Sequence, residues 1–215
     1  SGAILPGFAS GSSIYIPAHL RIVNVAEVPL FFPGTLIENL AFGVPHSHSD
    51  AAIERIEEVC RLLGVDPRAM EYLSGEKAEE EERWIETFSF GQCKLLMIAR
   101  ALVNNAELMC FHRPFVSLDQ IQTPTAMDLF LQHVKEKGIV QKSDMRLRRM
   151  RTIIMTSGKS VAVEKAHEII RLSRTKGLEK ITKEEVEEND LRRSSFDAGW
   201  SQPVDQYQGS GAVLL

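Results

Sequence analysis

The segment Phe90–Asn104 constrains the fold most, because it is apolar on nearly all sides over the length of a helix. Such a helix must be covered all round, so we expect a buried central helix. Short apolar runs follow it at Leu108–Phe111, Thr152–Thr156 and Ile169–Leu172. Continuous runs of this length are typical of strands that are buried on both faces.

Helical segments separate these strands along the chain. Helices are predicted at Ala51–Leu63, Pro124–Lys137 and Val161–His167, and further strands at Ser13–Ile16 and Leu20–Val25. This alternation of buried strands and helices indicates an α/β fold, with a mainly parallel sheet and flanking helices.

Local signals give the boundaries of some elements. A short helix is expected over Thr35–Phe42, Asp50 is placed to cap the helix Ala51–Leu63, and Gly64 is placed to end it. We divide the chain into N-terminal strands and their following loop (1–46), a helical subdomain (47–90), the rest of the α/β core (91–188) and a polar, disordered tail (189–215).

Composition excludes several classes of function. The net charge of −4 leaves no sequence-wide basic field, so nucleic acid is not an expected partner. The longest apolar runs fall short of the roughly 18 residues that a membrane span needs. Three cysteines without short spacing indicate reduced thiols in a cytosolic setting.

Four stretches, in the right order, resemble the nucleotide-binding domain of an ATP-binding-cassette (ABC) transporter. They correspond to the glutamine-loop segment, the signature motif with its helix, the second nucleotide motif with the D-loop, and the switch-histidine strand with its neighbour. These stretches are Val25–Leu40, Phe88–Leu102, Leu108–Asp119, and Thr152–Ser157 with Ala166–Leu172. The resemblance implies a P-loop NTPase-like fold of the ABC type with a helical subdomain.

The resemblance also implies site residues and partners. Ser89, Gly91 and Gln92 would contact ATP that a second cassette holds, so ATP is expected only at an interface and not on this chain alone. The interface with that cassette would use the residues Ser117, Leu118, Asp119 and Glu27. A transmembrane domain is the other implied partner, which places the chain at the cytosolic face of a membrane.

The chain departs from the family at the positions that carry the chemistry. The phosphate-cradling motif G-x-x-x-x-G-K-[ST] would lie before Ser1, and the Ser1-Gly2 start suggests a piece of a longer protein. The glutamine falls on Glu27, the magnesium-supporting acid on His112, the general base on Arg113 and the switch histidine on Ser157.

These replacements argue against ATP hydrolysis. Magnesium prefers oxygen ligands, which an imidazole does not offer. A guanidinium cannot accept a proton from water, and at about 5 Å it would repel a divalent ion by about 6–7 kcal/mol at an effective dielectric of about 20. We therefore expect no catalytic residues and a non-hydrolytic pairing and coupling module of a transporter. The alternatives are a scaffold protein without nucleotides and an ATPase half that a partner chain completes.

Several side chains have competing interpretations. Ser89 is either a helix cap or a contact to the partner's nucleotide. His112 and Arg113 either form an anion site, pair with Glu27 or Asp119, or are solvated, and the pairing that we expect is that of Arg113 with Glu27. Ser157–Ser160 looks like a phosphate loop but is too short, so a turn with Ser160 as helix cap is expected. No metal site is expected at His46 and His48. A lipid-headgroup or acidic contact is an open interpretation of the cluster Arg146, Arg148, Arg149 and Arg151.

Overall fold

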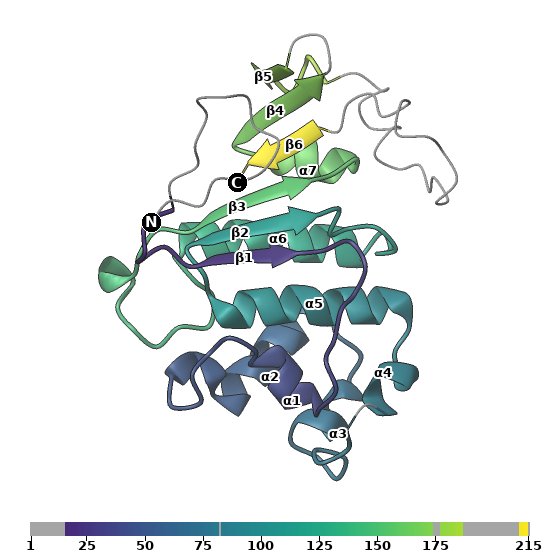
Figure 1. The fold of residues 1–215 in the computed structure, drawn as a ribbon. Helices are drawn as coiled ribbons and strands as arrows, with labels where there is room; N and C mark the ends of the chain where they lie inside the picture. Colours follow the sequence, from purple (N-terminus) through teal and green to yellow (C-terminus); the bar gives the residue numbers. More distant parts are fainter. Residues whose placement is uncertain (1–15, 82, 174–176, 187–210, 215) are drawn as a thin grey trace.

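A computed structural model describes residues 16–81, 83–173, 177–186 and 211–214. Its strands form one six-stranded sheet in the order β1-β2-β3-β6-β4-β5 (Figure 1). These strands are β1 (Ile22–Val25), β2 (Leu108–His112), β3 (Thr152–Thr156), β4 (Glu168–Ser173), β5 (Gly177–Ile181) and β6 (Gly211–Leu214). The strand predicted at Ser13–Ile16 lies outside the described residues except for Ile16, which is not in a strand.

The sheet contains the predicted parallel part, which is formed by three strands. β1, β2 and β3 pair in parallel, whereas β6 pairs antiparallel with both β3 and β4, and β5 pairs antiparallel with β4. Since β6 runs against both of its neighbours, β4 points in the same direction as β1–β3. The prediction of a disordered tail over 189–215 is wrong for Gly211–Leu214, which form a strand inside the sheet; residues 189–210 and 215 lie outside the described residues.

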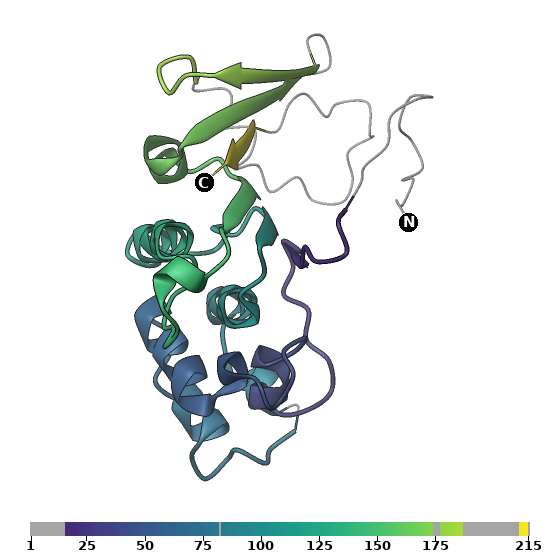
Figure 2. The same cartoon turned by 90° about the vertical axis from the view of Figure 1, so that its left-hand side faces the viewer.

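Helices pack on the sheet and extend away from it (Figures 1 and 2). The long helix α5 lies between the sheet and the smaller helices, and its buried residues from Cys93 to Val103 confirm the predicted central helix. The helices are α1 (Leu36–Leu40), α2 (Ile53–Leu63), α3 (Ala69–Leu73), α4 (Arg83–Thr87), α5 (Phe90–Asn104), α6 (Gln122–Lys135) and α7 (Ser160–Lys165), with short 3₁₀ turns η1 (Ser49–Ala51) and η2 (Met145–Leu147).

Capping explains some of the helix boundaries. Thr35 and Glu38 form a capping box at the start of α1, and Ser89 caps α5 by accepting from the backbone N–H of Gln92 at 3.3 Å. Gly64 ends α2 in the left-handed region (φ 69°), as predicted. Asp50 does not cap α2, whose N-cap residue is Ala52 without a side-chain hydrogen bond.

Asp50 instead belongs to a buried polar network at the amino-terminal ends of the strands. Its two carboxylate oxygens accept from Gln141 at 2.7 Å and from Asn105 at 3.2 Å, and its carboxylate lies 3.5 Å from the guanidinium of Arg55. Arg55 also donates to backbone carbonyls, among them those of Val103 at 2.9 Å and Val140 at 3.1 Å. These partners replace the water that the carboxylate of Asp50 lost on folding, so Asp50 is a structural residue.

Candidate functional site

The candidate site lies at the carboxyl ends of β1 and β2, where the chain leaves the sheet. Glu27 follows β1, His112 is the last residue of β2, and Arg113 comes directly after it. Nη1 of Arg113 donates to both carboxylate oxygens of Glu27, at 3.0 and 3.2 Å. This contact confirms the pairing that was predicted from the two exchanged charges.

Neighbouring groups hold the pair in place. The backbone N–H of Arg113 donates to Oγ1 of Thr156, the last residue of β3, at 3.0 Å. Arg113 has a left-handed backbone (φ 46°), which is uncommon for a residue with a Cβ atom and turns the chain sharply as it leaves β2. Nδ1 of His112 lies 4.0 Å from Glu27, and its side chain is 62% exposed.

Lys94 completes the site and was not identified from the sequence. It lies in the first turns of α5, is 2% exposed, and its Nζ donates to the backbone oxygens of Glu27 and, at 3.3 Å, of Arg113. Burial, opposed by nearby Glu27 and assisted by the Arg113 guanidinium, lowers the pKa of Lys94 to about 8. The signal in the sequence that could have identified Lys94 is its position among the apolar residues of a helix that is predicted to be buried.

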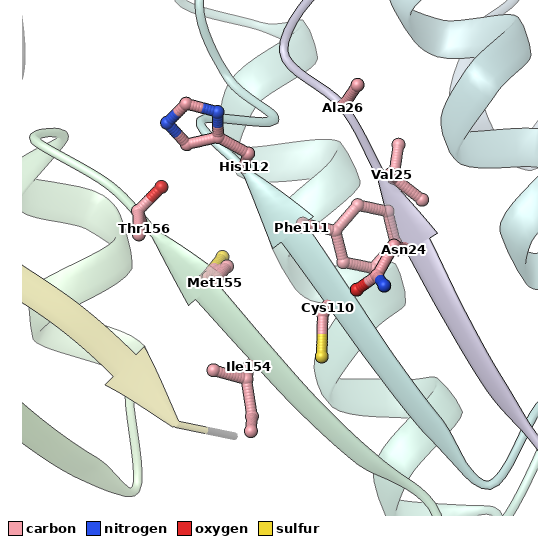
Figure 3. Close-up of a pocket in the computed structure, with 9 residues that line it drawn as sticks. All are labelled: Asn24, Val25, Ala26, Cys110, Phe111, His112, Ile154, Met155 and Thr156. Atoms are coloured by element: carbon pink, nitrogen blue, oxygen red, sulfur yellow. The ribbon is translucent and has the colours of Figure 1, made fainter. Parts of the chain in front are cut away.

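A groove of about 410 Å³ runs over the carboxyl halves of β1, β2 and β3 (Figure 3). His112 and Thr156 lie at one end of it, and the side chains of Cys110 and Ile154 lie further along the strands. The complete lining is Asn24, Val25, Ala26, Cys110, Phe111, His112, Ile154, Met155 and Thr156. Apart from His112, Asn24 and Thr156 this lining is apolar, so the groove suits an apolar occupant better than a polyphosphate.

Known proteins resemble most of this chain, although no protein-family model matches it. It is 28% identical over 162 residues to the ABC transporter BEA3 of Gibberella fujikuroi, and the matched region covers 75% of this chain and 11% of that protein. It is 30% identical over 153 residues to ATP-binding cassette sub-family C member 10 of Mus musculus, a match that covers 71% of this chain and 9% of that protein. It is 26% identical over 155 residues to ABC transporter I family member 17 of Arabidopsis thaliana, a match that covers 69% of this chain and 55% of that protein.

These matches support an ABC-type nucleotide-binding domain. The parallel arrangement of β1, β2 and β3 with flanking helices is consistent with the P-loop NTPase-like fold of that class. The chain spans between 9% and 55% of the length of these relatives, so it corresponds to one part of each of them.

The residues of the site do not fit the magnesium ion that the resemblance implies. Both carboxylate oxygens of Glu27, which lies at this edge, accept hydrogen bonds from Arg113. Next to it stand an imidazole and a guanidinium, which offer a hard cation no oxygen ligand. Among the residues that the structure describes, no group of three or more His, Cys, Asp or Glu side chains is placed to hold a metal ion.

The residues predicted to contact a partner's nucleotide make contacts within this chain. Ser89 caps α5, and Oε1 of Gln92 accepts from the backbone N–H of Asp66 at 2.8 Å. A Cβ atom on Gly91 would lie 2.8 Å from the carbonyl oxygen of Ser117, so only glycine allows this close approach. Gly91 and Ser117 are thus neighbours in space, and their contact to a partner's ATP stays a prediction.

The predicted interface residues Ser117, Leu118 and Asp119 differ in exposure. Ser117 and Asp119 are exposed, whereas Leu118 is buried in the core of this chain. Oδ1 of Asp119 accepts from the backbone N–H groups of Ile121 and Gln122 at the start of α6, at 2.8 and 2.6 Å. Their contact to a second cassette, like that of Glu27, stays a prediction.

The segment 157–159 has no regular structure and connects β3 to α7, and Ser160 is the first residue of that helix and not, as expected, its cap. The N-cap residue of α7 is Lys159, and it makes no side-chain cap. Oγ of Ser157 accepts from the backbone N–H of Lys159 at 3.2 Å. His48 likewise has a local role, because its Nδ1 accepts from the backbone N–H of Asp50 at 3.1 Å.

The four arginines of the basic cluster do not form one surface. Arg151 is buried, donates to Asn105 at 3.0 Å and lies 3.7 Å from Glu107, so its predicted membrane contact is wrong. Arg148 donates to backbone carbonyls between Glu136 and Ser143 and holds that loop together. Arg146 pairs with Asp144 at 2.8 Å and Arg149 donates to the carbonyl of His19 at 2.8 Å, although both remain exposed.

Proposed function

We propose that this ABC-type domain acts as a non-hydrolytic pairing and coupling module of a membrane transporter. It pairs with a second cassette through the face that carries Ser117 and Asp119, and contacts ATP that the second cassette holds. The observation that carries the proposal is the ion pair between Arg113 and Glu27, which occupies the positions of the general base and of the glutamine.

The chemistry of this pair supports the absence of hydrolysis. A general base must accept a proton from the attacking water, and a guanidinium remains protonated at every working pH. Arg113 is also anchored, because it binds Glu27 by its side chain and Thr156 by its backbone N–H. The Lys94 ammonium contacts the backbone of both ends of the pair and adds further positive charge where a cation would have to bind.

Exposed apolar side chains support docking on the transmembrane part. Val28 and Leu30 directly follow Glu27 and are 53% and 61% exposed, and Phe42 at the end of α1 is 61% exposed. Nη2 of Arg100 donates to the carbonyl of Leu30 at 2.7 Å and holds this segment against α5. Apolar side chains on an anchored segment are typical of a protein contact. The described helices include none that is long and apolar enough to cross a membrane.

A nucleotide titration tests the proposal. A fluorescent ATP analogue is titrated against the chain alone, against a cassette with an intact phosphate loop, and against their mixture. We expect the chain to add binding only in the mixture, and Ser89→Ala to weaken that binding at least threefold. Thr35→Ala is the matched control, because it removes a helix cap of the same kind from α1 and lies outside the predicted interface.

Two results would overturn the proposal. If the mixture binds no more analogue than the intact cassette alone, the scaffold function remains, which the contacts of Ser89, Gly91 and Gln92 within this chain favour. If the chain alone hydrolyses ATP, and Arg113→Ala abolishes the reaction, Arg113 has a catalytic role that the proposal denies.

A further inference from the structure

The loop between α6 and β3 carries a surface patch that the proposed function does not use. We call residues 142–150 the basic–apolar loop, because four of its nine residues are basic, one is acidic and three are apolar. Its net charge is therefore +3, whereas the whole chain carries −4. Figure 1 shows this loop in green, projecting beyond the amino ends of β1, β2 and β3. A partner of negative charge is therefore attracted to this loop and not to the chain as a whole.

Apolar and basic side chains are exposed side by side on the basic–apolar loop. Leu147 is 83% exposed, which is the largest value for a large apolar side chain in the described part of the molecule. Met150 and Met145 are 75% and 48% exposed. The side chains of Arg146 and Arg149 are 87% and 60% exposed. Exposed apolar groups with flanking cations suit a contact that is both apolar and anionic.

Hydrogen bonds fix the loop in the shape that exposes these side chains. The guanidinium of Arg148 donates to the carbonyl oxygens of Ser143 and Gln141, both at 3.0 Å. Asp144 caps the turn η2 by accepting from the backbone N–H of Arg146 at 2.9 Å. The loop is thus ordered before a partner binds, so less conformational entropy is lost in the contact.

The loop lies at the same end of the molecule as Phe42, which the proposed function places against the transmembrane part. Asn104 donates to the carbonyl of Phe42 at 3.4 Å, and its own carbonyl accepts from Nη1 of Arg21 at 3.5 Å. The guanidinium groups of Arg21 and Arg149 lie 3.2 and 3.9 Å from one carboxylate, that of Glu107. The loop is therefore continuous with the surface that faces the membrane in the proposed function, on which the choice of partner below rests.

We propose that the basic–apolar loop contacts the surface of an anionic phospholipid bilayer. Leu147, Met150 and Met145 insert at the boundary between headgroups and acyl chains. Arg146 and Arg149 bind the anionic headgroups, which their long side chains reach beside the inserted residues. An acidic peptide has the same charge, but peptides are usually held in a groove or at a strand edge. A projecting loop offers neither, and a bilayer requires neither.

Co-sedimentation of the full chain with lipid vesicles tests the contact. The vesicles consist of phosphatidylcholine with roughly 30% phosphatidylserine, and are compared with phosphatidylcholine alone. We expect several times more binding to the anionic vesicles. Arg146→Gln/Arg149→Gln should lower that binding at least fivefold, because one cation near such a surface contributes about fivefold. Leu147→Ser/Met150→Ser should also lower it at least fivefold, because the inserted side chains are lost.

Two double variants elsewhere on the chain are the matched controls. Arg61→Gln/Arg68→Gln removes two arginines whose side chains are 54% and 57% exposed. Ile121→Ser/Leu178→Ser removes two apolar side chains that are 78% and 72% exposed. All four residues lie outside the basic–apolar loop, so both control variants should bind the anionic vesicles as the wild type does.

A dye attached at position 147 measures insertion independently of the amount bound. Leu147→Cys carries a polarity-sensitive dye in a chain with Cys110→Ala, because Cys60 and Cys93 are buried. Its emission should shift to the blue when anionic vesicles are added. The same dye on Leu178→Cys should not shift.

Two results would overturn the inference. Equal binding to both kinds of vesicle, without a shift of the dye at position 147, would mean that the loop does not contact anionic lipid. Binding that the loop variants lower no more than the control variants would place the lipid contact elsewhere on the chain. Neither measurement needs ATP or a second cassette, so failure here is distinguishable from failure of the proposed function.

Discussion

Two polar clusters lie at opposite ends of the same parallel strands, and they differ in how completely their charges are satisfied. At the amino ends, Asp50 and Arg55 are buried, and Arg55 donates to a set of backbone carbonyls. At the carboxyl ends, Glu27 and Arg113 are part-exposed and pair mainly with each other, beside the exposed ring of His112.

The difference separates a structural cluster from a functional one. The amino-end cluster joins α2, α5 and the loop after α6 through buried hydrogen bonds. The carboxyl-end cluster borders an open groove at the edge where parallel α/β sheets bind ligands. Charge at the first end therefore contributes to stability, whereas charge at the second lies beside the groove, at the candidate site.

The largest expected effect comes from making the same substitution at both ends. Arg55→Met leaves Asp50 buried without its cation, so the free energy of unfolding should fall by about 3–5 kcal/mol. Arg113→Met is the matched change and should cost less than about 2 kcal/mol, because Glu27 can then be hydrated. Urea unfolding measures both, and equal losses would contradict the distinction between the two clusters.

Alkaline pH sharpens the comparison through Lys94 at the carboxyl end. The pKa of Lys94 is about 8 in the folded chain, against 10.5 when it is unperturbed, so the unfolded chain binds more protons between these values. The stability of the wild type relative to Lys94→Met should therefore rise between pH 8 and 10.5, by at most about 3 kcal/mol.

Lys77→Met is the control for this experiment. The pKa of Lys77 is raised by its hydrogen bond to Glu71, so its stabilising contact is retained up to pH 10.5. The corresponding difference between the wild type and Lys77→Met should stay flat over the same range. A flat difference for Lys94→Met as well would show that Lys94 is hydrated in the folded chain.

Acid pH tests the amino end through His133 on α6. The ring is fully buried, neither ring nitrogen has a hydrogen-bond partner among the described residues, and burial with nearby Arg151 and Arg55 lowers its pKa to about 3. The unfolded chain takes up a proton near pH 6.5, so stability is lost as the pH falls below that value. Between pH 7 and 5 the wild type should lose about 2 kcal/mol more than His133→Phe.

Unfolding curves of the wild type and His133→Phe at a series of pH values measure this loss. If His133→Phe and the wild type lose the same stability in acid, the imidazole of His133 is not held neutral in the folded chain.

The smallest expected effect is the coupling between Glu27 and Arg113. A double-mutant cycle with Glu27→Gln and Arg113→Gln should give about 1 kcal/mol, because the pair is part-exposed. The coupling should weaken in 1 M salt, where the Debye length falls to about 3 Å. A coupling above about 3 kcal/mol that salt does not change would place this pair in the same class as Asp50 and Arg55.

Local patterns in the sequence predicted the main elements and one contact of the site. The apolar length of Phe90–Asn104 and the short runs of β2 and β3 depend only on neighbouring residues, which explains why they were recognised. The pairing of Glu27 with Arg113 was predictable because two opposite charges stand at the ends of adjacent parallel strands.

Contacts between residues far apart in the chain explain what the sequence did not predict. Asp50 looked like a helix cap because its partners Asn105 and Gln141 lie 55 and 91 residues away. Lys94 reaches Glu27 across 67 residues. β6 is four residues of a polar, glycine-rich tail, and only its place between β3 and β4 makes it a strand.

The rate of phosphate release tests the central claim that the carboxyl ends of β1 and β2 do not support hydrolysis. It is measured with magnesium and ATP on the chain alone and on its mixture with an intact cassette, for the wild type, His112→Ala and Arg113→Ala. We predict no release from the chain alone, and a rate in the mixture that neither substitution lowers. Magnesium-dependent release from the chain alone that falls at least tenfold in either variant would contradict the account.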